Sequence, residues 1–173
     1  MAKKLVKAQG LILPLLIGMA APAMALQPEE RHWELAVVGD IMMGTNFPVK
    51  RLPPDGGAGI FSPAEPLLRS ADLTFGNLEG PLAIGGASTK TGCSKCYAFR
   101  TPPEYARHLS EAGFDALSVA NNHARDFGED GQRQTVQALA DHGIGWAGTL
   151  AQPMVILEDP SGRRCAFLAF STG

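Results

Sequence analysis

Short apolar runs alternate with helix-type patterns along the chain, and polar residues follow three of the apolar runs. These runs are residues 35–38, followed by Gly39-Asp40, residues 71–75, followed by Gly76 to Glu79, and residues 114–120, followed by Asn121 to His123. A short, continuous apolar run is typical of a strand buried on both faces of a parallel sheet. The pattern therefore predicts three buried parallel strands, each ending in a polar cluster.

Helix signals separate these strands. Residues 62–65 and 101–104 each contain the hydroxyl residue, the proline and the glutamate of a capping box, and Gly113 predicts where the second helix ends. A third helix is predicted from near Asp130 to a stop at Gly143.

Three further strands are predicted at residues 144–147, 155–157 and 165–170, with a hairpin-type turn at 160–162 joining the last two. Alternation of strands and helices indicates right-handed crossovers and a mainly parallel sheet covered on both faces. The fold class predicted from the pattern is α/β.

The first 25 residues have the features of a secretory signal peptide. Three lysines precede an apolar run, and the small-x-small triplet Ala23-Met24-Ala25 predicts cleavage after Ala25. The apolar run is short for a bilayer span and is interrupted by Pro14, Gly18 and Pro22, which favours cleavage over a retained membrane anchor. We therefore expect an exported protein, located in the periplasm or cell envelope.

The domain division follows from that segment. Residues 1–25 form the signal peptide, 26–34 a short N-terminal segment and 35–173 one α/β domain. Since residues 171–173 directly follow a predicted strand, where another crossover is expected, we expect the chain to be part of a longer domain.

Charge argues against a nucleic-acid partner. The chain has a net charge of −2, and removal of the signal peptide, which carries three lysines and no acidic residue, brings it to −5. No run of basic residues remains to track phosphates. The 45% hydrophobic content is ample for a globular core.

Cysteine use depends on the compartment. In an oxidising compartment Cys93 and Cys96 are candidates for a disulfide. A thioredoxin-like redox motif is the alternative, but such a motif should begin a helix, whereas Gly92 precedes this pair. Cys165 lies in an apolar strand pattern and is expected to be buried and unpaired.

The polar strand ends suggest a cation site. Ligands of open α/β sheets gather beyond the carboxyl ends of the strands. Asp40, Glu79 and Asn121 to His123 fall there, and carboxylates, an amide oxygen and an imidazole suit a divalent cation. Local roles are the alternative: Asp40 capping a turn, Asn121 and Asn122 satisfying turn backbone, His123 bonding within a loop, and Asp126 pairing with Arg125 or capping a turn.

Four ordered motifs resemble a known family. They are Gly39-Asp-Ile-Met-Met-Gly44, Asn77-Leu-Glu-Gly80, Phe99-Arg-Thr-Pro-Pro-Glu104 and Ala120-Asn-Asn-His-Ala-Arg-Asp-Phe-Gly128. Together they resemble the bacterial CapA family of capsule and poly-γ-glutamate synthesis, from about Leu35 onward. That family belongs with the calcineurin-like metallophosphoesterases, so the resemblance implies an α-β-β-α sandwich, here without its C-terminal part.

The resemblance also implies roles for individual residues. Asp40 would bind a first metal, Glu79 would bridge two metals, Asn122 would bind the second, and His123 would be catalytic, donating a hydrogen bond to a phosphoryl oxygen or leaving group. Asn77, Asn121, Arg125 and Asp126 would support these ligands or contact substrate. The implied cofactors are divalent metal ions, two in the full-length protein.

Two departures limit what the resemblance implies. Met42 stands where ordinary metallophosphoesterases carry a metal-binding histidine. The downstream histidines of a complete two-metal site are also absent from this sequence, so enzyme activity is left open.

Three functions remain after this comparison. The preferred one is an exported protein of capsule or poly-γ-glutamate biosynthesis or export with a divalent-metal site. The others are an exported metal-dependent phosphoesterase and a non-catalytic binding module for an anionic polymer or its synthase complex at the membrane.

Overall fold

The computed structural model describes residues 32–92, 96–159 and 161–172. The predicted signal peptide and its cleavage site lie outside the described residues, as do Cys93 and Pro160. Signal cleavage and the Cys93–Cys96 disulfide therefore stay predictions. No helix among the described residues is long and apolar enough to span a bilayer.

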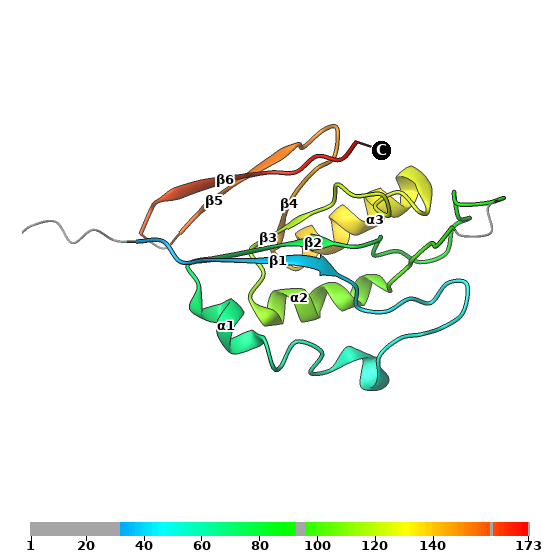
Figure 1. Ribbon diagram of the computed structural model, residues 1–173, viewed down its shortest axis with the longest axis horizontal. Helices are drawn as coiled ribbons and strands as arrows, with labels where there is room; N and C mark the ends of the chain where they lie inside the picture. Colours follow the sequence, from blue (N-terminus) through cyan, green and yellow to red (C-terminus); the bar gives the residue numbers. More distant parts are fainter. Residues whose placement is uncertain (1–31, 93–95, 160, 173) are drawn as a thin grey trace, which may run out of the picture. The chain divides into compact units, whose positions relative to one another are not determined.

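A four-stranded parallel sheet organises the domain (Figure 1). Its strands lie in the order β1 (Leu35–Ile41), β2 (Leu73–Leu78), β3 (Ala116–Ser118) and β4 (Gly145–Ala147). Every neighbouring pair is parallel. The α/β fold class with a parallel sheet is confirmed.

Helical segments connect consecutive strands. They are η1 (Pro54–Gly57), α1 (Glu65–Ser70), η2 (Pro103–Tyr105), α2 (Ala106–Ala112) and α3 (Gly128–Asp141). Figure 1 shows α1 and α2 on one face of the sheet. The core on this side includes the fully buried side chains of Leu109, Leu117 and Leu139, and burial of such a side chain contributes roughly 1.5–3 kcal/mol.

An antiparallel hairpin lies on the other face of the sheet (Figure 1). It consists of β5 (Met154–Glu158) and β6 (Arg164–Leu168), as the turn pattern predicted. The Phe167 ring stacks on Phe75 of β2 with centroids 4.6 Å apart. The parallel sheet and the β-hairpin are therefore two stacked β layers, as the central β-β part of the expected sandwich requires.

The predicted burial of the first strand on both faces is wrong. Ala36 and Val38 pack against the helical core, but Leu35 and Val37 on the opposite face are 44% and 66% exposed. The reason is that β1 is an edge strand of the sheet and the hairpin stacks on β2, the next strand inward.

The two predicted capping boxes are not formed. Helix α1 begins at Glu65 with Ala64 as its N-cap residue, because Pro66 fits the first helical turn. The Thr101 hydroxyl instead donates to the Gly44 carbonyl at 2.6 Å. The predicted end of the second helix is confirmed, since Gly113 adopts φ 95° directly after α2.

Candidate functional site

Strand register brings the first polar residues together. In the β1–β2 ladder Asp40 lies opposite Asn77, after a register shift between Val37 and Asp40. Asn77 in turn lies opposite Ser118 of β3. Strand β2 runs through Gly76 and Asn77 to Leu78, so Asn77 belongs to the strand itself rather than to a loop after it. The carboxyl ends of β1 and β2 therefore share one polar edge.

Two carboxylates converge on a single nitrogen at this edge. The Asn77 amide donates from Nδ2 to Asp40 Oδ1 at 2.7 Å and to Glu79 Oε2 at 3.3 Å. Asn77 and Glu79 are two residues apart, so their side chains leave the chain on the same side. Asp40 is exposed and Glu79 is partly buried, which leaves the pair open to solvent on one side.

Asn121 orients this arrangement from the end of β3. Its Nδ2 donates to the Leu78 carbonyl at 2.8 Å and to Asn77 Oδ1 at 3.0 Å, while its Oδ1 accepts the His123 backbone N–H at 2.9 Å. The two backbone partners distinguish the amide oxygen from the amide nitrogen of Asn121. Asn77 must then present its own nitrogen to the carboxylates.

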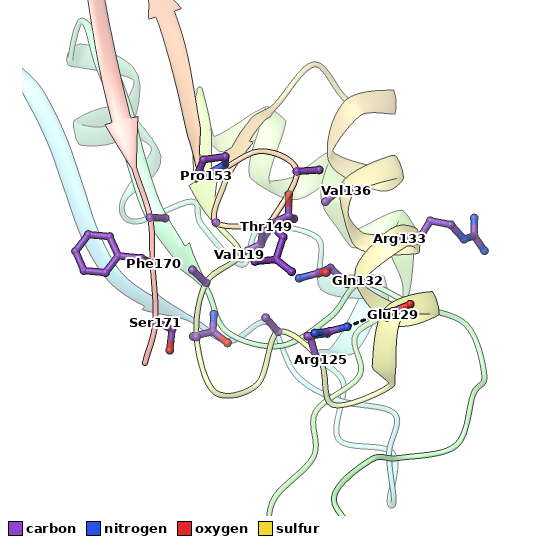
Figure 2. A pocket seen from close by; sticks show the side chains of 17 residues that line it. Val119, Arg125, Glu129, Gln132, Arg133, Val136, Thr149, Pro153, Phe170 and Ser171 are labelled. Atoms are coloured by element: carbon purple, nitrogen blue, oxygen red, sulfur yellow. Dashed lines mark hydrogen bonds and ion pairs between the residues drawn. The ribbon is translucent and has the colours of Figure 1, made fainter. Parts of the chain in front are cut away.

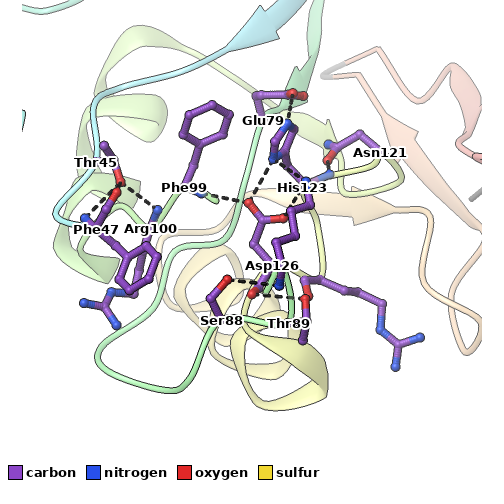
Figure 3. A network of polar contacts seen from close by, with 12 residues as sticks. Thr45, Phe47, Glu79, Ser88, Thr89, Phe99, Arg100, Asn121, His123 and Asp126 are labelled. Carbon is purple, nitrogen blue, oxygen red and sulfur yellow. Dashed lines mark hydrogen bonds and ion pairs between the residues drawn. The ribbon is translucent and has the colours of Figure 1, made fainter. Parts of the chain in front are cut away.

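His123 lies beside Glu79 and is held from its other side (Figure 3). Its Nε2 is 3.5 Å from Glu79 Oε1, and its Nδ1 is 2.8 Å from Asp126 Oδ2. The Phe99 ring packs on the imidazole with centroids 4.4 Å apart, and the Phe99 backbone N–H donates to Asp126 Oδ2 at 2.7 Å. The ring therefore has contacts on one edge, on the opposite edge and on a face.

A lysine that sequence reasoning missed completes the group. Lys90 Nζ lies 2.9 Å from Asp126 Oδ1 and 3.0 Å from His123 Nδ1. Its loop is attached through Thr89, which donates to the Asp126 carbonyl from its backbone and to the Arg125 carbonyl from its hydroxyl. Lys90 sits in a Gly-, Ser- and Thr-rich segment without periodicity, so no sequence signal placed it here.

Two other predicted site residues adjoin cluster residues in the chain, but their side chains make no hydrogen bond to the cluster. The Asn122 side chain is exposed and makes no hydrogen bond with the described part of the chain. Arg125 pairs with Glu129 at 2.8 Å. Met42 is 40% exposed. The structure thus unites Asp40, Asn77, Glu79, Asn121, His123 and Asp126, and it leaves Asn122 and Arg125 outside that network.

The residues present fit a hard divalent cation in part. Asp40 and Glu79 offer acceptor oxygens that converge on one positively polarised group, the Asn77 amide, and oxygen ligands are those that hard cations prefer. His, Cys, Asp and Glu side chains of the described residues form no group of three that could hold a metal. A cation here would therefore need amide or water oxygens besides the two carboxylates.

A cavity of about 710 Å³ adjoins the cluster (Figure 2). Arg125, which precedes α3, and Gln132 of α3 line this cavity together with Thr149 and Phe170. Asn121 lines this cavity and also belongs to the polar network, so the two are contiguous.

Comparisons with known proteins agree with the motifs. Residues 34–173 match the family described as bacterial capsule synthesis protein PGA_cap. The chain is 27% identical to the capsule biosynthesis protein CapA of Bacillus anthracis, over 93% of this chain and 42% of that protein. It is 30% identical to the PGA biosynthesis protein CapA of Bacillus subtilis (strain 168), over 78% of this chain and 36% of that protein.

A third relative has no described function. The uncharacterized protein y4sH of Sinorhizobium fredii is 32% identical over 66% of this chain and 24% of that protein. The chain thus spans less than half the length of these relatives. The family match covers residues 34–173, which is nearly all of the described structure, and the chain belongs to the bacterial capsule synthesis protein (PGA_cap) family.

Proposed function

We propose that this is an exported protein of capsule or poly-γ-glutamate biosynthesis or export, and that it binds a divalent cation at the carboxyl ends of β1 and β2. The observation that carries the proposal is the convergence of Asp40 and Glu79 on the Asn77 nitrogen. Membership of the capsule synthesis family supports the biological context. The N-terminal signal pattern supports export.

The residues around the proposed cation would have distinct roles. Asp40 and Glu79 hold the cation, and Asn122, exposed on the adjoining turn, supplies an amide oxygen. Asn77 and Asn121 keep the carboxylates oriented through the bonds described above. A bound divalent cation would polarise a phosphoryl oxygen and acidify a water molecule. His123 is the titratable side chain placed to meet a group bound beside Glu79.

One observation favours a second function, in which the protein binds an acidic polymer without catalysis. The 710 Å³ cavity lies next to Asn121 and has Arg125 on its wall, a side chain suited to carboxylates.

A complementation experiment tests the proposal. The whole gene is deleted in the native host and replaced by wild type, by Asp40→Ala/Glu79→Ala, or by Asp141→Ala/Glu158→Ala, a control that removes two exposed carboxylates elsewhere on the domain. Surface polymer is then quantified. We expect loss of polymer in the deletion strain and the site variant, and recovery with wild type and control.

The outcomes separate the alternatives. Unchanged polymer in the deletion strain would refute a role in capsule production. Full recovery with the site variant, with its metal lost, would support the polymer-binding function. Phosphoesterase activity of the purified wild type that disappears in the site variant would support a hydrolase.

A further inference from the structure

Lys90, Asp126 and His123 form a buried chain of contacts behind the proposed cation site. Asp126 is fully buried, the His123 side chain is 11% exposed and the Lys90 side chain is 23% exposed. Asp126 Oδ2 receives the Phe99 N–H and Oδ1 faces the Lys90 ammonium. A carboxylate without water around it is tolerated when such partners surround it.

The position of one proton on His123 follows from these contacts. Nδ1 is 2.8 Å from Asp126 Oδ2 and 3.0 Å from Lys90 Nζ, so it is near both an acceptor and a donor. If Nδ1 carried no proton, its lone pair would face a carboxylate lone pair at 2.8 Å in a buried place, which is repulsive. Lys90, by contrast, forms an ion pair with Asp126 Oδ1 at 2.9 Å and is partly open to water for its N–H groups.

We propose that Asp126, with its charge balanced by Lys90, is a positioning residue that holds His123 as the tautomer with a proton on Nδ1. The Nδ1–H donates to Asp126 Oδ2, and Nε2, which lies 3.5 Å from Glu79 Oε1, then keeps a lone pair for a proton or cation bound beside Glu79. Phe99 packs on the ring and its backbone N–H fixes the same carboxylate oxygen. Segment 88–90 thereby becomes part of the site.

This tautomer changes what His123 can do. A neutral imidazole with its proton on Nδ1 accepts at Nε2, so it takes a proton or binds a cation there and does not donate a hydrogen bond. The family resemblance instead implied that His123 donates a hydrogen bond to a phosphoryl oxygen or leaving group. The use of this lone pair on a bound group rests on the proposed function, whereas the tautomer itself does not.

Nitrogen NMR of the full-length protein labelled with ¹⁵N-histidine tests the proposal. Spectra are recorded in mildly alkaline buffer, in which neutral imidazoles predominate, as purified and again after treatment with EDTA. The His123 signals are assigned by their loss in His123→Gln. We expect Nδ1 to carry the proton in both samples, and a proton on Nε2 would overturn the proposal.

Two variants test the separate contributions. Asp126→Ala leaves Nδ1 beside the Lys90 donor and without an acceptor, so the proton should move to Nε2, and retention of the wild-type tautomer in a folded Asp126→Ala protein would refute the role of Asp126. Lys90→Met should keep the proton on Nδ1 but melt several degrees lower than Lys50→Met, which removes an exposed lysine. Lys90→Arg should restore the melting temperature.

Equal melting temperatures of Lys90→Met and Lys50→Met would refute the proposal that Lys90 balances the charge of Asp126. Should Asp126→Ala fail to fold, the wild-type spectrum alone still decides the tautomer. These results are independent of the proposed function, which fails if the wild-type protein contains no metal.

Discussion

Asn77 donates its side-chain amide to Asp40 Oδ1 at 2.7 Å, across the register pair that joins β1 and β2. The same nitrogen lies 3.3 Å from Glu79 Oε2. The neutral Asn77 amide therefore lies between two carboxylates that would otherwise repel each other, and it donates a hydrogen bond to each.

The substitution Asn77→Asp should make the fold depend on a cation. A third carboxylate beside Asp40 and Glu79 adds repulsion in place of two hydrogen bonds. We expect thermal unfolding of Asn77→Asp in EDTA to occur at a lower temperature than that of wild type, and added Mn²⁺ to raise it more than it raises wild type. An equal response of the two proteins to Mn²⁺ would argue against a cation at this edge.

The two faces of β6 should respond differently to truncation. Phe167 stacks on Phe75, whereas its neighbour Leu168 is 63% exposed. Phe167→Ala should lower the free energy of unfolding by about 2 kcal/mol, less than for a fully buried phenylalanine, and Leu168→Ala by less than about 0.5 kcal/mol. Urea denaturation measures both, and similar losses would contradict the packing of the hairpin on β2.

The turn between β5 and β6 should make stability depend on pH through Asp159. Burial alone would raise the pKa of Asp159, but hydrogen bonds donated by Ser161 and Arg163 outweigh it and hold the pKa well below the usual range. Because the pKa is lower in the folded state, the charged carboxylate stabilises the fold above the ordinary aspartate pKa, about 4. That stabilisation is lost as the pH falls below this value.

Asp159→Asn should therefore melt several degrees lower than wild type at neutral pH, and the difference should shrink as the pH falls below about 4. Asp141→Asn, at an exposed position, is the control. A difference between Asp159→Asn and wild type that stays constant with pH would contradict the assignment.

The mature N-terminus should begin at Leu26. The triplet at residues 23–25 predicts cleavage after Ala25. N-terminal sequencing of the protein recovered from the cell envelope measures this directly. Recovery of residues 1–25 on the mature protein would favour the membrane-anchor alternative.

The strand-end cluster was predictable because apolar runs end where polar residues begin. That pattern located Asp40, Glu79 and the Asn121–His123 turn, and the parallel sheet brings these ends together. The third helix was also predicted to within two residues at each end. Both predictions rest on local patterns that the tertiary structure leaves intact.

Other features depended on contacts between distant residues. The Thr101 hydroxyl bonds to Gly44, 57 residues away, and so does not cap a helix. Exposure of Val37 follows from the edge position of β1, which the apolar run does not reveal. Lys90 reaches Asp126 from 36 residues away, and a lone lysine in a loop carries no pattern that indicates its partner.

Metal content tests the central claim most directly. The product of the whole gene is purified as wild type, as Asp40→Ala/Glu79→Ala and as the control Asp141→Ala/Glu158→Ala, and each is measured by elemental analysis. We predict stoichiometric divalent metal in wild type and control, and its loss in the Asp40/Glu79 variant. Wild type without metal, or equal metal in all three proteins, would contradict a cation site formed by Asp40 and Glu79.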